Sequence, residues 1–141
     1  MNTENRKRPI ILYVLIALLI FQGLSGIFGG IFLIADPTGA TLNIPIDWLE
    51  GSPFSSYFIP GLILLIVLGI FPLYVIYLLW IKSYFSKYSV MFVGIALILW
   101  IVVQIVFIGY GSDPPLQAIY GFLGLLILIL SLSPSMKNYY K

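Results

Sequence analysis

The chain has 141 residues, of which 61% are apolar and only 9% are charged. A soluble domain carries charge on about a quarter of its positions, so we expect most of this surface to face lipid. Cysteine and histidine are both absent, which excludes disulfides, thiol redox chemistry and the commonest ligand of zinc, copper and haem.

Four stretches are apolar and long enough to cross the hydrocarbon of a bilayer, which takes roughly 20 helical residues. We predict spans over residues 9–35, 59–80, 89–110 and 114–132, none of which contains a charged residue. The predicted fold is therefore an all-α membrane protein, a bundle of four transmembrane helices that forms one domain over residues 1–141.

The charged residues predict the orientation of this bundle. All seven basic residues lie at the chain ends or between the second and third spans: Arg6, Lys7, Arg8, Lys82, Lys87, Lys137 and Lys141. Basic loops stay in the cytoplasm, so we predict a cell (inner) membrane protein with both termini inside. A cleaved signal peptide is the competing interpretation of the N-terminus. The long first run has no small-x-small cleavage pattern and favours an uncleaved anchor.

The first outer connection, residues 36–58, is too apolar to be a free linker. Its sequence predicts a turn over 36–39 and one or two helical turns over 45–51, opened by proline and ended by glycine. We expect an interfacial cap that anchors the bundle or forms a lid. The functional interpretation is that Asp47, Trp48 and Glu50 edge a pocket that binds a cation or supplies an acid and a base. No third catalytic group accompanies them, so we assign no catalytic residue.

Small residues predict where helices approach closely, because packing in lipid depends on backbone proximity and polar contacts. Gly26 and Gly30 form a G-x-x-x-G pair in the first span. The predicted packing residues are Gly23, Gly26, Gly29, Gly30, Gly121 and Gly124. This packing fits either a helix of the same chain or a second copy.

Pro72 lies in the middle of the second span and predicts a static kink, because proline cannot donate to the carbonyl of Leu68. If each residue adds about 1.5 Å of helix rise, Gln22 lies at a similar depth in the bilayer. The indole of Trp100 also lies at a depth compatible with the freed carbonyl, and we predict that it donates to this carbonyl.

A second hypothesis is an outward-facing cavity between Gln104, Tyr120, Gly29 and Gly30, covered by residues 36–58. An amide and a phenol there would orient a lipid, a quinone or another amphiphile. The alternative is that Gln104 and Tyr120 simply bond to neighbouring helices.

Several functions lack their usual residues. The spans contain no charge of the kind that marks ion or proton paths, and the chain has no phosphate-binding loop and no metal cluster. The cytoplasmic segments are too short for a nucleic-acid site. We therefore predict no cofactor, no metal and no nucleic-acid partner.

Two stretches carry a resemblance to a known group: Gly29-Gly30 through Ala35-Asp36-Pro37-x-Gly39, and Ser52-Pro53-Phe54 through Pro60-Gly61. They resemble small bacterial four-helix membrane proteins, which are similar to the DoxX-like group in size and number of spans. The resemblance covers the first hairpin and implies a bacterial inner-membrane origin. It implies no activity, and this chain lacks the polar helix residues expected of that group.

We therefore predict a small non-catalytic membrane protein, an accessory, assembly or protective subunit that acts through helix packing and its outer loop. Its partners would be membrane lipids and either another protein or further copies of itself. The alternative is a binder or carrier of a lipid, quinone or other amphiphile in the outward-facing cavity. A membrane enzyme comes third.

Overall fold

The computed structural model describes residues 7–108 and 116–140, and this part of the chain is helical without any strand. The six α-helices are α1 (Ile10–Ala35), α2 (Phe58–Leu65), α3 (Phe71–Trp80), α4 (Ser86–Ile108), α5 (Leu116–Ser131) and α6 (Pro134–Tyr139). The π-helical turn η4 (Ile66–Ile70) joins α2 and α3 into one continuous helix. Two 3-10 helices, η2 (Ala40–Leu42) and η3 (Ile46–Leu49), lie in the connection between α1 and α2.

Three helices are long and apolar enough to cross a bilayer: Ile10–Ala35, Phe58–Trp80 and Ser86–Val106. The predicted all-helical architecture is thus confirmed for the described residues, and the three long apolar helices fit a membrane protein. Helix α5 is also apolar but shorter, with 16 residues. The junction of the third and fourth predicted spans, residues 109–115, lies outside the described residues.

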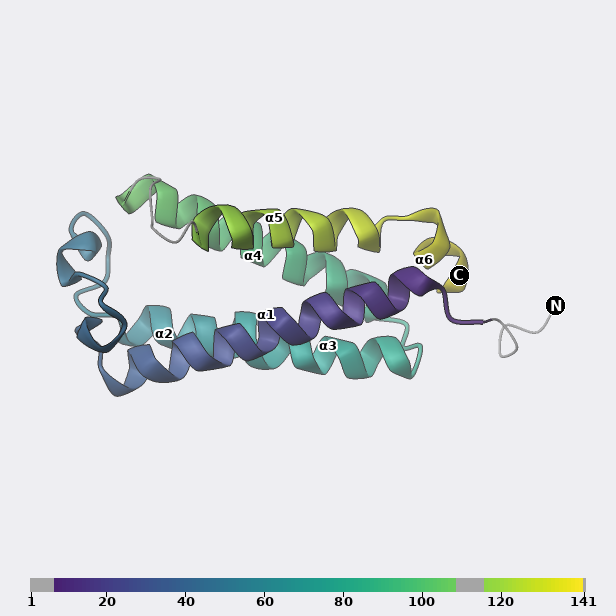
Figure 1. Ribbon diagram of the computed structural model, residues 1–141, viewed down its shortest axis with the longest axis horizontal. Helices are drawn as coiled ribbons and strands as arrows, with labels where there is room; N and C mark the ends of the chain where they lie inside the picture. The colour runs from purple at the N-terminus through teal and green to yellow at the C-terminus, as the bar shows by residue number, and fades with distance from the viewer. Residues whose placement is uncertain (1–6, 109–115, 141) are drawn as a thin grey trace.

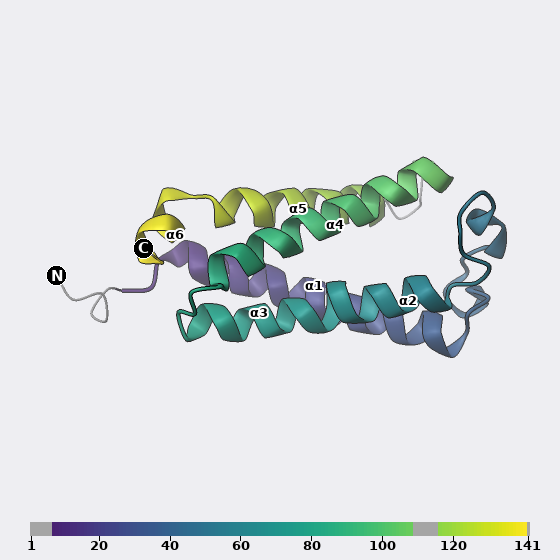
Figure 2. The same cartoon turned by 180° about the vertical axis from the view of Figure 1, so that it is seen from behind.

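The helices form two hairpins. Helix α1 packs along α2, η4 and α3, and α4 packs along α5. Figures 1 and 2 show the hairpins close together at the end that holds α6 and the turn from α3 to α4, and apart at the end that holds residues 36–57. We call these ends the inner end and the outer end.

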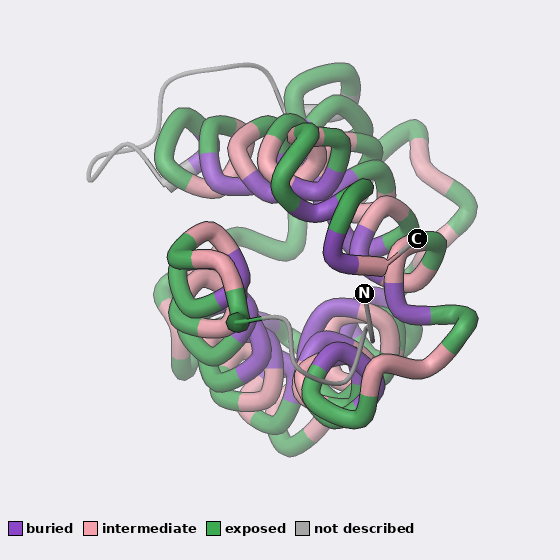
Figure 3. The backbone as a smooth tube through the Cα atoms, turned by 90° about the vertical axis from the view of Figure 1, so that its right-hand side faces the viewer, coloured by how far each residue is buried: buried purple, intermediate pink, exposed green. Residues whose placement is uncertain are grey.

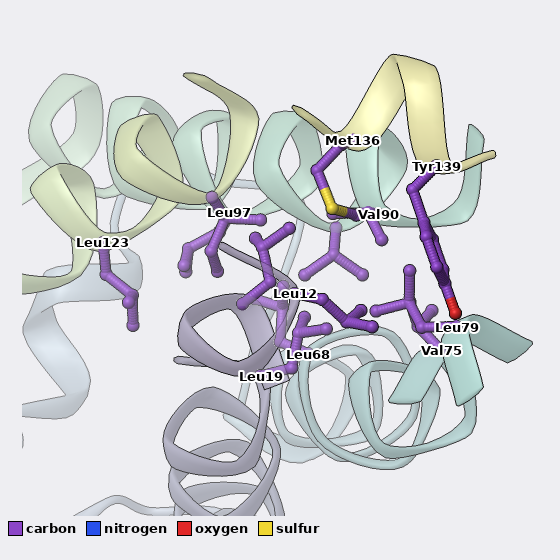
Figure 4. Packing of buried hydrophobic residues seen from close by; sticks show 13 residues of the cluster. Leu12, Leu19, Leu68, Val75, Leu79, Val90, Leu97, Leu123, Met136 and Tyr139 are labelled. Carbon is purple, nitrogen blue, oxygen red and sulfur yellow. The ribbon is translucent and has the colours of Figure 1, made fainter. Parts of the chain in front are cut away.

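One hydrophobic cluster joins the two hairpins, and we call it the shared core (Figure 4). Its members are Leu12, Leu15, Leu19, Leu68, Val75, Leu79, Val90, Val93, Leu97, Leu123, Ile127, Met136 and Tyr139. Seen along the molecule, the buried residues face the middle of the ring of helices (Figure 3). The outermost member on each long helix lies near its midpoint, so the shared core occupies only the inner half.

In the outer half, each hairpin is packed on itself. Leu33 is buried against Gly61 of the same hairpin, and Ile101 lies next to Gly121 of its own hairpin. Neither Leu33 nor Ile101 belongs to the shared core. Among the described residues, the cluster that ties the hairpins together therefore stops short of the outer end.

Candidate functional site

The glycines of α1 bring its backbone against the second helix of the same hairpin. A Cβ atom at Gly26 would overlap the carbonyl oxygen of Leu68, and one at Gly30 would lie 2.7 Å from the amide nitrogen of Leu65. Gly23 approaches the carbonyl of Gly69, whereas Gly29 faces the side chain of Leu64. The small-residue face predicted from the sequence is thus occupied within the chain.

The second hairpin has a matching contact at which two glycines meet. A Cβ atom at Gly94 would lie 3.0 Å from the carbonyl oxygen of Gly124, and one at Gly124 would lie 3.2 Å from that of Gly94. Gly121 is looser, because its nearest neighbour, Ile101, would lie 3.5 Å away. Sequence reasoning missed Gly94, because an isolated glycine does not reveal its partner on another helix.

A single polar contact crosses the first hairpin at the turn η4. The side-chain nitrogen Nε2 of Gln22 donates to the carbonyl of Leu68 at 3.0 Å, and Gln22 is only 2% exposed. Pro72 has no amide hydrogen for this carbonyl, and the π-helical turn ends directly before Phe71 and Pro72. The freed carbonyl is therefore satisfied by Gln22, where the sequence analysis had expected Trp100.

Two of the predicted ligand residues extend the buried faces of α4 and α5 beyond the shared core. Gln104 lies seven positions after Leu97, and Tyr120 lies three before Leu123, so each pair shares a helix face. Both Gln104 and Tyr120 are half-buried. The ring of Tyr120 stacks on Phe21 of α1 with centroids 5.9 Å apart, which places its face toward the first hairpin.

We call this region the outer site and define it by Leu64, Trp100, Gln104 and Tyr120. Leu64, Trp100 and Tyr120 are partly buried and pack against the outer edge of the shared core. Gly29 and Gly30, which the sequence analysis placed in the same cavity, face α2 instead. The amide and the phenol of the predicted site are thus on the second hairpin, and the first hairpin presents aliphatic and aromatic side chains.

The connection from α1 to α2 is an ordered cap. The carboxylate of Asp36 accepts hydrogen bonds from the backbone and side chains of Thr38 and Thr41, with the two hydroxyl bonds at 2.6 and 2.7 Å. These bonds, led by that of the Thr38 hydroxyl, lower the pKa of Asp36 to about 2. The hydroxyl of Tyr57 donates to the carbonyl of Pro45 at 2.6 Å. The predicted turn is confirmed by the bond from the amide of Gly39 to the carbonyl of Asp36.

The predicted helical turn of this cap is η3, which lies against α4. Asp47 and Trp48 lie on η3 and Glu50 directly follows it, all three exposed. Within residues 7–108 and 116–140, no group of three acidic residues is placed to hold a metal ion. The cap therefore covers the outer end. Figure 1 shows it reaching from the first hairpin toward the second.

The fold and the outer site define the class of protein: a helical membrane protein whose two hairpins share a core over half of their length. Comparison of the chain with models of protein families, with curated proteins and with solved structures finds no match.

Proposed function

We propose that the chain is a non-catalytic, four-span membrane protein that binds one amphiphilic lipid in the outer site. This proposal rests on the observation that the shared core ends near the middle of the helices and does not reach the outer end. The faces that are buried in the inner half continue outward through Gln104 and Tyr120, which are only half-buried and lie beyond the shared core.

A hydrocarbon chain is the natural occupant of such a region. Spaces between helices that protein side chains leave open inside a bilayer are filled by lipid, and binding sites are mostly apolar with a few placed polar groups. Leu64 and Trp100 supply apolar contacts beside the shared core. The amide of Gln104 and the hydroxyl of Tyr120 supply hydrogen bonds nearer the outer end, where a headgroup or an ester would lie.

The proposed orientation rests on charge. The described basic residues all lie at the inner end: Lys7 and Arg8 before α1, Lys82 in the turn from α3 to α4, Lys87 in the first turn of α4, and Lys137 on α6. Under the positive-inside rule this end is cytoplasmic. Helix α5 is about 24 Å long at 1.5 Å per residue. In this proposal α5 forms the fourth span.

An accessory subunit remains the second candidate, and one observation favours it. At the outer end of α4, the face of the helix that points away from Ile101 and Gln104 is exposed: Val102, Val103, Ile105 and Val106. This projecting end offers a surface to another membrane protein. The glycine faces do not, since they pack within the hairpins.

Native mass spectrometry of the protein, gently extracted from its host's membranes, tests the proposal. We expect one retained lipid or other amphiphile per chain. The double variant Gln104→Leu and Tyr120→Phe should lower its affinity about thirtyfold, because each lost hydrogen bond contributes roughly 1 kcal/mol. Val103→Leu, on an exposed part of α4 one position away, is the matched control and should retain it. A stoichiometric protein partner without a bound small molecule would instead support the accessory subunit.

A further inference from the structure

The inner end holds two cations on aromatic rings. The guanidinium carbon of Arg8, just before α1, lies 3.7 Å from the ring centre of Trp80 at the end of α3. The ammonium of Lys82, in the turn from α3 to α4, lies 4.1 Å from the ring centre of Tyr139 on α6. Cations at such distances are attracted by the face of the ring.

Helix α6 links these two contacts into one cluster. The hydroxyl of Tyr140 donates to the carbonyl of Leu79 at 2.6 Å, and the rings of Tyr139 and Tyr140 lie 4.8 Å apart. Burial raises the pKa of the Tyr140 hydroxyl, and the nearby charge of Arg8 opposes this rise. Arg8 and Lys82, which lie far apart in the sequence, are thus both held at the inner end, near Tyr140 and on Tyr139 respectively.

The backbone at Lys82 provides an independent observation. Its φ of 55° is left-handed, a conformation that favours glycine. The amide of Ser83 donates to the carbonyl of Leu78, and that of Lys82 to the carbonyl of Leu79. This is the Schellman pattern that ends a helix, in which the left-handed residue is usually glycine. A lysine at this position is strained, and such strain points to a function for its side chain.

The described part of the inner end offers these cations no carboxylate. The acidic side chains within residues 7–108 and 116–140 are Asp36, Asp47 and Glu50, all in the connection at the outer end. The side chain of Trp80 is 48% exposed, so the ring that the Arg8 guanidinium contacts is open to the membrane. An anionic group at the membrane interface would meet here two positive charges that no described carboxylate neutralises.

We propose that Arg8 and Lys82 together bind the phosphate of an anionic phospholipid in the leaflet at the inner end. Guanidinium groups bind phosphate through two parallel hydrogen bonds, and lysine adds a point charge. Basic pockets between helices bind anionic headgroups in this way, and Trp80 packs at the level of the headgroups. This site is separate from the outer site and does not depend on the proposed function.

Titration of the purified full chain with phosphatidylglycerol and with phosphatidylcholine, followed by native mass spectrometry, tests this site. We expect a preference for the anionic lipid that Lys82→Gly lowers about fivefold. The same substitution should leave the fold as stable or more stable, because glycine suits the left-handed backbone. Trp80→Leu keeps every charge and should also weaken the preference, since it removes the platform of Arg8.

Lys87→Gln is the matched control. It removes one positive charge, and the ammonium of Lys87 lies 5.8 Å from the ring of its neighbour Tyr88, outside the cluster. Three results would overturn the proposal: an unchanged preference in Lys82→Gly, an equal loss in Lys87→Gln, or displacement of the lipid by an equal concentration of inorganic phosphate. The last result would show a site for soluble anions.

Discussion

Gly26→Ala is expected to lower the free energy of unfolding by about 3 kcal/mol, the upper part of the range for overpacked cores. The added methyl group would overlap the carbonyl oxygen of Leu68, and the α-carbon of Gly69 would lie only 2.8 Å from it. Both are backbone atoms, so no side-chain rotation relieves the clash. The hairpin must separate, which also stretches the bond from Gln22 to Leu68. Reversible unfolding in mixed micelles measures the loss.

Gly121→Ala is the matched control for this prediction. Its new methyl group would lie at an ordinary contact distance of 3.5 Å from Ile101, and alanine favours the helix by about 1 kcal/mol over glycine. We expect unchanged or slightly increased stability. Equal losses in the two variants would show that the close approach of α1 and η4 does not stabilise the fold.

The second large effect is expected at Gln22. Gln22→Leu keeps the volume but leaves the carbonyl of Leu68 buried without a partner, since Pro72 cannot donate to it. An unsatisfied buried acceptor costs about 1–3 kcal/mol. The orphaned Oε1 of Gln22, which has no partner among the described residues, is removed at the same time. We therefore expect a loss of about 1 kcal/mol, at the low end of that range.

A double-mutant cycle with Pro72→Ala isolates this bond. Alanine restores an amide hydrogen that η4 is able to use for the carbonyl of Leu68, so Gln22→Leu should cost much less in that background. The measured quantity is the coupling free energy between the two positions. Strictly additive losses would mean that the bond from Gln22 does not replace the one that Pro72 removes.

The sequence predicted features that depend on spacing along one helix. The face of Gly26 and Gly30, the turn at Asp36 and the apolar helices all follow from local patterns. The common depth of Gln22 and Pro72 followed from the rise per residue, but depth does not specify rotation about the helix axis. Trp100 had a compatible depth, and the prediction that it would satisfy Leu68 failed for this reason.

Features that depend on contacts between distant segments were missed. Gly94 meets Gly124 only because α4 and α5 pack side by side. The last predicted span ends at residue 132, and directly after it Ser133 and Pro134 begin a further helix, α6, where the Ser133 side chain accepts from the amide of Met136. The sequence did not predict that a helix ends at Lys82, because the residue that marks such an end is normally glycine. The early end of the shared core depends on how the two hairpins meet, which a one-dimensional pattern does not specify.

The two proposed sites lie toward opposite ends of the molecule along the bilayer normal. In these two proposals, the outer site receives a hydrocarbon chain between the hairpins, whereas the inner end binds a phosphate through Arg8 and Lys82. Because the shared core separates them, variants at one end should leave lipid binding at the other unchanged.

Photocrosslinking with a phospholipid that carries a diazirine on its acyl chain is the most direct test of the outer site. The reaction is run on the full chain in vesicles, and the labelled residues are mapped by mass spectrometry. We predict labels on the inward-facing Trp100, Gln104 and Tyr120 that saturate as the probe concentration rises and that unlabelled lipid competes away, whereas labels on the exposed Val103 and Phe122 rise in proportion to the probe. Labels confined to Val103, Phe122 and other exposed positions would contradict a lipid between the hairpins.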